Sequence, residues 1–102
     1  MTLVKLYVRI ETISNLGSHT LTATLISKPD GSITNTTVAS ASKSVNAASS
    51  GRNQIFTEAN FSNPPNLTKG QMGSIKLKFG SDIGGSTDFF ITSVWEMDNN
   101  TI

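Results

Sequence analysis

The chain has 102 residues, a formal net charge of +1, charged residues at only 15% and no cysteine. This length suits one domain over residues 1–102, and the missing cysteines, with His19 as the one histidine, exclude disulfides and a structural zinc site. Basic residues are scattered singly, without the dense patch that nucleic-acid binding requires. The sequence contains no run of about 18 apolar residues, so no membrane-spanning helix is predicted.

The first predicted strand covers residues 3–13. Apolar residues alternate with polar or charged ones from Val4 to Ile10. This period of two places alternate side chains on opposite faces of a strand, whereas a helix would scatter them around its axis. Residues 15–18 form a turn signal, and a second strand is predicted at 19–27, where leucine and alanine alternate with threonine.

A proline–aspartate–glycine sequence within residues 28–31 predicts a hairpin between the second strand and a third strand at 32–41. Ile33 and Val38 have opposite parity, so the third strand is predicted to lie at a sheet edge or to be short. The stretch 41–53 is rich in serine and alanine and has no period. We expect a long loop there, and we treat it as a candidate arm that contacts a partner.

The fourth and fifth strands are predicted at residues 54–61 and 73–79, separated by two prolines that end the fourth. In the fourth, one face would carry the odd-numbered residues Ile55, Thr57, Ala59 and Phe61. In the fifth, Ile75, Leu77 and Phe79 would point inward while Lys76 and Lys78 point outward.

The sixth predicted strand, residues 87–97, is the most apolar. Phe89, Ile91, Trp95 and Met97 share one face, and Phe90 and Val94 share the other. Apolar residues on both faces predict either a central strand that is covered on both sides or a strand that faces a neighbouring subunit.

These elements predict an all-β fold, a single antiparallel β-sandwich of 6–8 strands. Turn signals recur every 8–12 residues or so, as in sandwiches and barrels. No cysteine pair is present and the tryptophan lies near the end of the chain, so a jelly-roll-like arrangement fits better than an immunoglobulin-like one.

Few residues in the chain could carry catalysis. His19 is predicted to be a surface histidine, and the carboxylates are predicted to be solvated, so we expect no catalytic residue, no cofactor and no enzymatic activity. The segment 80–88 offers two aspartates on a glycine-rich connection, which leaves calcium binding open as an alternative. Carbohydrate binding is also open, with Tyr7 as the aromatic contact on a polar strand face and Phe56, Phe90 and Trp95 as further aromatics that could be exposed.

Over its whole length the chain resembles small all-β virion proteins of tailed bacteriophages, of the capsid decoration (cement) or fibre-tip type. The features that carry this resemblance are the starting methionine, the absence of a signal peptide and of cysteine, the strands rich in serine, threonine and asparagine, and the apolar last strand. The resemblance implies a β-sandwich that forms a homo-oligomer, often a trimer. It would clamp the major coat protein or another virion protein, and would be located in the virion after synthesis in the host cytoplasm.

The leading hypothesis is therefore a non-enzymatic virion structural protein, a homo-oligomeric decoration protein that stabilises a phage shell. The alternative is a carbohydrate- or receptor-binding module of a tail fibre or lectin, and a small hydrolase is the third hypothesis. Partner contacts would come from the chain ends, the 42–53 loop and the second face of the last strand. The candidate interface residues are Met1, Leu3, Val45, Arg52, Phe90, Val94 and Ile102.

Overall fold

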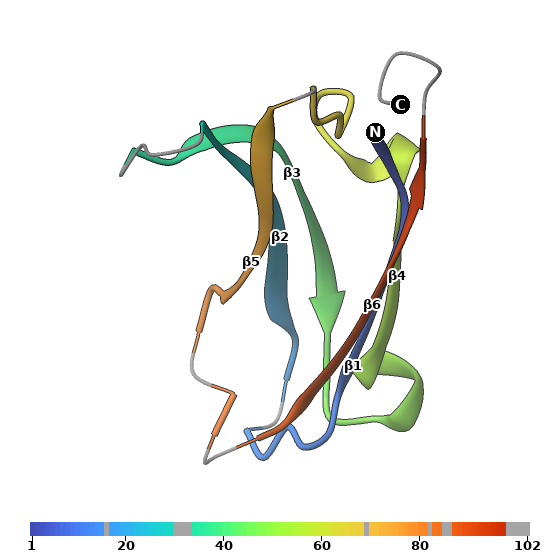
Figure 1. Ribbon diagram of the computed structural model, residues 1–102. Coiled ribbons are helices and arrows are strands. Elements are labelled where there is room, and N and C mark those ends of the chain that lie inside the picture. The colour runs from blue at the N-terminus through green and yellow to red at the C-terminus, as the bar shows by residue number, and fades with distance from the viewer. Residues whose placement is uncertain (16, 30–33, 69, 82, 85–86, 98–102) are drawn as a thin grey trace.

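The computed structural model contains two three-stranded antiparallel sheets (Figure 1). It describes residues 1–15, 17–29, 34–68, 70–81, 83–84 and 87–97, and within these ranges it contains no α-helix. One sheet has the order β4-β1-β6 and consists of β1 (Thr2–Ile10), β4 (Asn53–Thr57) and β6 (Phe89–Glu96). The other has the order β3-β2-β5 and consists of β2 (His19–Pro29), β3 (Thr36–Val45) and β5 (Gln71–Phe79).

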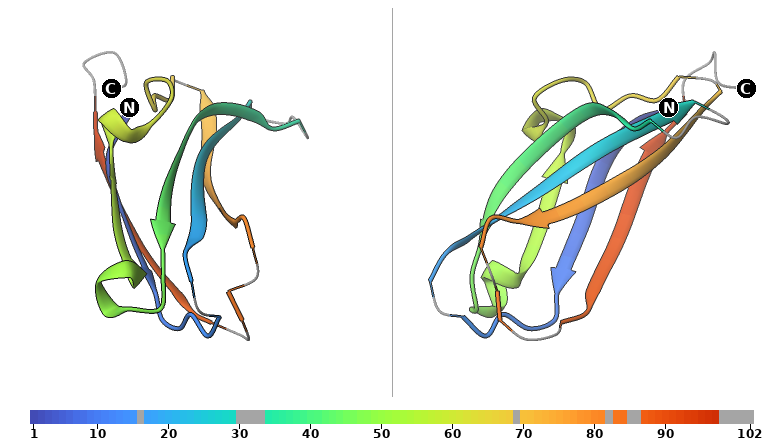
Figure 2. Two further views of the ribbon diagram at one scale, coloured as in Figure 1. Left: turned by 180° about the vertical axis from the view of Figure 1, so that it is seen from behind. Right: turned by 90° about the vertical axis from the view of Figure 1, so that its left-hand side faces the viewer.

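The two sheets face each other as layers, and the core lies between them (Figure 2). Each sheet contributes its central strand: Leu6 and Val8 of β1 and Leu21 and Ala23 of β2 are all at most 2% exposed. Full burial of a leucine- or valine-sized side chain stabilises a fold by about 1.5–3 kcal/mol relative to exposure. The all-β class predicted from the alternating pattern is therefore confirmed.

Strand β1 confirms the alternation, with one change of parity. Leu6, Val8 and Ile10 are buried and Tyr7 is exposed. Pairing with β6 shifts register between Leu3 and Lys5, as at a β-bulge. A bulge inserts one residue and moves the preceding side chains to the opposite face, so Leu3 is buried and Val4 is only partly covered. The strand ends at Ile10, three residues before the predicted end.

The predicted hairpin is confirmed, because β2 and β3 pair antiparallel, while residues 30–33 lie outside the described part of the chain. The loop predicted at 41–53 is wrong. Strand β3 runs to Val45, and a 3-10 turn η1 (Ser49–Arg52) precedes β4. The inward positions of β3 include Ala39 and Ala41, whose small side chains fill the space beside the leucines of β2 without producing an apolar period that can be read in the sequence. The predicted edge position of β3 is confirmed.

Strand β4 is shorter than predicted. It ends at Thr57, and a 3-10 turn η2 (Glu58–Asn60) follows, closed by reciprocal hydrogen bonds between Thr57 and Asn60. The prediction that Ile55 and Phe61 share a face is wrong, because the turn changes the direction of the chain between them. Phe56 is fully buried and Ile55 is 47% exposed, so the even-numbered face of this strand packs on the core.

The two layers are joined along one side and splayed along the other. On the β3–β4 side, Gln54 Nε2 donates a hydrogen bond to the Ser44 carbonyl (3.1 Å), and the Ser62 amide donates one to the Ser40 carbonyl (2.9 Å). On the β5–β6 side the ribbons diverge along most of their length (Figure 1). The rings of Phe79 and Phe89 stack there with their centroids 5.6 Å apart. We call this the open side.

Strand β6 lies at a sheet edge on the open side. The interpretation of the last strand as a central strand covered on both sides is therefore wrong. The prediction that its side chains divide between two faces agrees with its pairing with β1. Ile91 and Phe89 lie opposite the buried Val8 and Ile10, whereas Phe90 lies opposite the exposed Arg9.

Candidate interaction surface on strand β6

Four large apolar side chains of β6 are exposed. The exposed fractions are 40% for Phe89, 57% for Phe90, 48% for Ile91 and 43% for Val94. We call these four residues the β6 surface. Phe90 and Val94 lie on the outer face of the sheet, whereas Phe89 and Ile91 lie on the inner face. The Phe89 ring stacks on Phe79 of β5, yet both inner side chains stay at least 40% exposed because β6 lies at the sheet edge.

The other three edge strands each carry a feature that discourages pairing with another chain. Strand β4 is only five residues long, and β5 carries exposed Lys76 and Lys78. Strand β3 carries Lys43 at an inward position, with its Nζ 5.8 Å from the centre of the Phe56 ring. Short strands, edge lysines and inward charges are the usual protections of a sheet edge.

Strand β6 has none of these protections. Its first seven residues, 89–95, contain no charge, no proline and no glycine. Such an uncharged segment rich in aromatic and β-branched residues pairs readily with another strand when it lies at an edge. The strand thus combines unprotected backbone with exposed apolar side chains.

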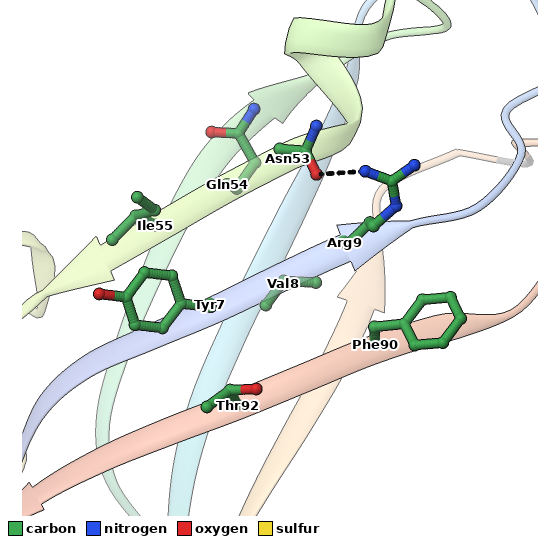
Figure 3. Close-up of a pocket in the computed structure, with 8 residues that line it drawn as sticks. All are labelled: Tyr7, Val8, Arg9, Asn53, Gln54, Ile55, Phe90 and Thr92. Atoms are coloured by element: carbon green, nitrogen blue, oxygen red, sulfur yellow. Dashed lines mark hydrogen bonds between the residues drawn. The ribbon is translucent and has the colours of Figure 1, made fainter.

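A shallow groove of about 230 Å³ crosses the outer face of the same sheet (Figure 3). Tyr7 and Arg9 of β1 form its floor, with Ile55 of β4 on one side and Phe90 of β6 on the other. Arg9 Nη1 donates a hydrogen bond to Asn53 Oδ1 (3.3 Å). The groove therefore offers two aromatic rings beside a guanidinium and an amide.

Two further hollows lie away from β6. One, of about 470 Å³, is lined by Thr22, Thr24, Lys76 and Lys78 on the outer face of the other sheet. The second, of about 430 Å³, lies over Phe61 and the two adjacent prolines. Neither gathers an acid with a base among its described lining residues.

The structure brings two of the sequence-predicted interface residues together, Phe90 and Val94 on the outer face of β6. Leu3 and Val45 are buried in the core at 1% and 0% exposure, so in the single chain their side chains are not available to a partner. At the start of the chain, the Met1 ammonium donates to the Leu67 carbonyl (2.9 Å) and the Leu67 amide to the Met1 carbonyl (2.8 Å).

The remaining predicted contacts do not gather with these two. Arg52 Nη1 donates a hydrogen bond to the Glu11 carbonyl at 2.8 Å, and Ile102 lies outside the described residues. Sequence reasoning missed the exposure of Phe89 and Ile91. Both lie opposite buried residues of β1 and so face inward, and the edge position of β6 leaves them half-covered.

The prediction that His19 is a surface histidine is wrong, since it is 7% exposed. Its Nδ1 lies 2.7 Å from Ser81 Oγ, and its Nε2 lies 3.1 Å from the Asn15 carbonyl oxygen. A carbonyl only accepts, so Nε2 carries a proton and donates to it; in the neutral imidazole, Nδ1 then accepts from the Ser81 hydroxyl. His19 thereby links the segment after β1 to the segment after β5.

The segment proposed for calcium, 80–88, is described only in part, because residues 82, 85 and 86 lie outside the described ranges. Ile83 within it is buried, and its carbonyl accepts hydrogen bonds from the amides of Ser14 and Asn15. Over the described stretches, no group of three histidine, aspartate or glutamate residues is arranged to hold a metal ion.

None of the helical turns in the described ranges has the length and apolarity of a membrane-crossing helix. Comparisons of the chain with protein-family models, with curated proteins and with solved structures gave no match.

Proposed function

We propose that this protein is a non-enzymatic virion structural protein, a homo-oligomeric decoration protein that binds neighbouring protein subunits on a phage shell. The observation that carries the proposal is the β6 surface, where unprotected strand backbone lies beside Phe89, Phe90, Ile91 and Val94, each at least 40% exposed. Exposed apolar patches of this kind mark protein–protein contacts.

The fold supports this role because each of its sheets has fewer strands than a full jelly roll. We propose a reduced β-sandwich related to the jelly roll, in which two sheets of four strands enclose the core. Here each sheet has three strands, and β5 and β6 both lie at edges on the open side. A strand supplied by a neighbouring subunit at β6 would cover the half-exposed inner side chains and extend that sheet to four strands.

The proposal is tested by the protein composition of purified particles. Particles from the organism that encodes this chain are expected to contain it at a copy number in fixed ratio to the major coat protein, beside coat, portal or tail genes in the genome. Tagged Phe90→Asp should lose attachment to particles that lack the native chain. Met72→Asp is the matched control. Met72 is 61% exposed on β5, an edge strand of the second sheet, and the change adds the same charge. Absence of the chain from intact particles would refute the proposal.

Carbohydrate binding remains a second candidate because of the groove on the outer face. Tyr7 is 37% exposed and Phe90 57% exposed, and Figure 3 shows both rings turned toward the viewer on the same side of the sheet as Arg9. Aromatic faces stack on the apolar side of sugar rings while polar side chains bind hydroxyls. On a glycan array this candidate predicts a defined bound set that Tyr7→Ala removes and Tyr7→Phe largely keeps. No binding by the native chain to any glycan would exclude it.

A further inference from the structure

We propose that the partner of strand β6 is a second copy of this chain, paired antiparallel along β6 about a two-fold axis at Thr92. This inference rests on the proposed function only in taking the β6 surface as a protein contact. The result is one continuous sheet of six strands, in the order β4-β1-β6-β6-β1-β4, with the open sides of the two copies adjacent to one another.

The backbone of β6 is suited to this pairing. In an antiparallel ladder, alternate residues direct their N–H and C=O groups toward one neighbour and the intervening residues direct theirs away. Strand β6 pairs with β1 along its whole length, from Phe89 opposite Ile10 to Glu96 opposite Thr2. The outward groups of β6 therefore form a complete row that another strand of equal length can pair with.

The side chains of β6 are complementary to themselves in this register. Centring the pair on Thr92 places Phe90 opposite Val94 of the second copy on the outer face, and Phe89 opposite Trp95 on the inner face. Every position from 89 to 95 then faces an uncharged residue. Cross-strand pairs between aromatic and β-branched residues stabilise antiparallel sheets.

The exposed side chains of β6 set an upper limit on the apolar area of the contact. With about 150–200 Å² for each whole side chain of this size, the exposed fractions of the β6 surface correspond to about 350 Å² of apolar area per copy. Two copies therefore offer roughly 700 Å² at most, so the contact is a small one in which the backbone hydrogen bonds of the paired edges supply much of the affinity.

A two-fold pair also satisfies the free backbone groups of β6 in both copies, whereas a head-to-tail contact would leave one β6 edge unpaired. An isologous interface uses the same surface on both copies and leaves no second β6 edge exposed. The other edges of the assembly are then β3, β4 and β5, which carry the protections described above. A foreign strand on β6, or the trimer that the resemblance implies, would use the same surface differently, and the test separates these arrangements.

Pairing centred on Thr92 brings two like charges together at each end, and this repulsion can be tested. It places Asp88 opposite Glu96 of the second copy at both ends of the pair, and both side chains are exposed. Like charges directly opposite destabilise an antiparallel pair. Glu96→Lys converts both contacts into opposite-charge pairs, so it is expected to lower the dimer dissociation constant roughly three- to tenfold at low salt.

Disulfide trapping gives the direct test, because the chain has no native cysteine. Directly opposite residues in an antiparallel pair have Cα atoms about 4.5–5.5 Å apart, within the range that a disulfide bridges. Thr92→Cys, at an exposed position, is expected to form a covalent dimer in high yield under mild oxidation at micromolar concentration. Lys76→Cys, also exposed but on β5, is the matched control and should stay largely monomeric.

Each outcome decides between the arrangements. A dimer by mass at Thr92→Cys but not at Lys76→Cys supports the inference. Efficient trapping at Ser93→Cys instead of Thr92→Cys, equal trapping at Lys76→Cys, a trimeric mass of the native chain, or a monomer at all concentrations would overturn it. A monomer that still attaches to particles would leave the role as a decoration protein standing and remove only its homo-oligomeric state, whereas a dimer absent from particles would refute the proposed function alone.

Discussion

Replacement of Phe56 by alanine measures how β4 is oriented against the core. Phe56 is fully buried, its ring centroid lies 6.3 Å from that of Phe61, and Lys43 Nζ lies 5.8 Å from its centre. Truncation of a buried phenylalanine costs about 3–5 kcal/mol, because transfer free energy is lost and a cavity remains. A domain of this size has about 5–15 kcal/mol of stability in total, so Phe56→Ala should lose a large fraction of it.

The matched control is the adjacent residue. Ile55 is 47% exposed, so Ile55→Ala should cost less than about 1 kcal/mol. Urea unfolding followed by far-UV circular dichroism at low protein concentration gives both values, provided the slopes agree. Phe56→Leu, which leaves a smaller cavity, supplies a value if Phe56→Ala does not fold. A larger loss for Ile55→Ala than for the Phe56 variants would refute the orientation of β4 described above.

Three further substitutions test other parts of the fold by the same unfolding measurement. His19→Ala should destabilise the protein by about 1–3 kcal/mol because it removes two hydrogen bonds, each worth about 0.5–1.5 kcal/mol. A change below about 0.5 kcal/mol would contradict the linking role of this side chain. Gly51→Ala should destabilise by about 0.5–1.5 kcal/mol, since an added Cβ displaces the Asn46 side-chain amide and breaks its hydrogen bond from the Ala48 amide. Unchanged stability would argue against the close approach at η1. Glu11→Gln should change stability by less than about 0.5 kcal/mol, because Glu11 and Arg9 form a half-exposed pair at 3.8 Å, and a loss above about 1 kcal/mol would show that this pair matters more than its exposure implies.

The sequence predicts the fold class and the central strands because their side chains alternate with enough bulk to be read. Leu6, Val8 and Ile10 in β1 and Leu21 and Leu25 in β2 carry the core, and all are buried as the period of two requires. The pattern fails where backbone irregularities reset parity. The bulge near Val4 and the turn η2 are set by local hydrogen bonding and pairing, which the apolar pattern does not encode.

Strand β3 escapes detection beyond Ala41 for a different reason. Its inward residues are alanines, Lys43 and Val45, so hydrophobicity does not rise and fall with a period of two. Burial of small side chains depends on how closely the opposite strand approaches, and that distance is a property of the assembled sheets.

The candidate surface is predictable in part. Apolar residues on both faces of 89–97 leave two alternatives from sequence, a central strand or a strand facing a neighbouring subunit, and the edge position of β6 removes the first. The involvement of Ile91 in the β6 surface likewise follows only from that edge position. The gathering of Tyr7 and Phe90 in one groove likewise depends on strand order.

Hydrogen–deuterium exchange tests most directly the claim that β6 is covered in the functional protein. At high protein concentration, amides in 89–96 that point away from β1 should exchange slowly, and dilution or Phe90→Asp should restore rapid exchange. The corresponding outward amides of β5, in 71–79, should exchange rapidly throughout. The account would be contradicted if the outward amides of β5 and β6 exchanged at equal rates at every protein concentration, both in the free protein and on particles.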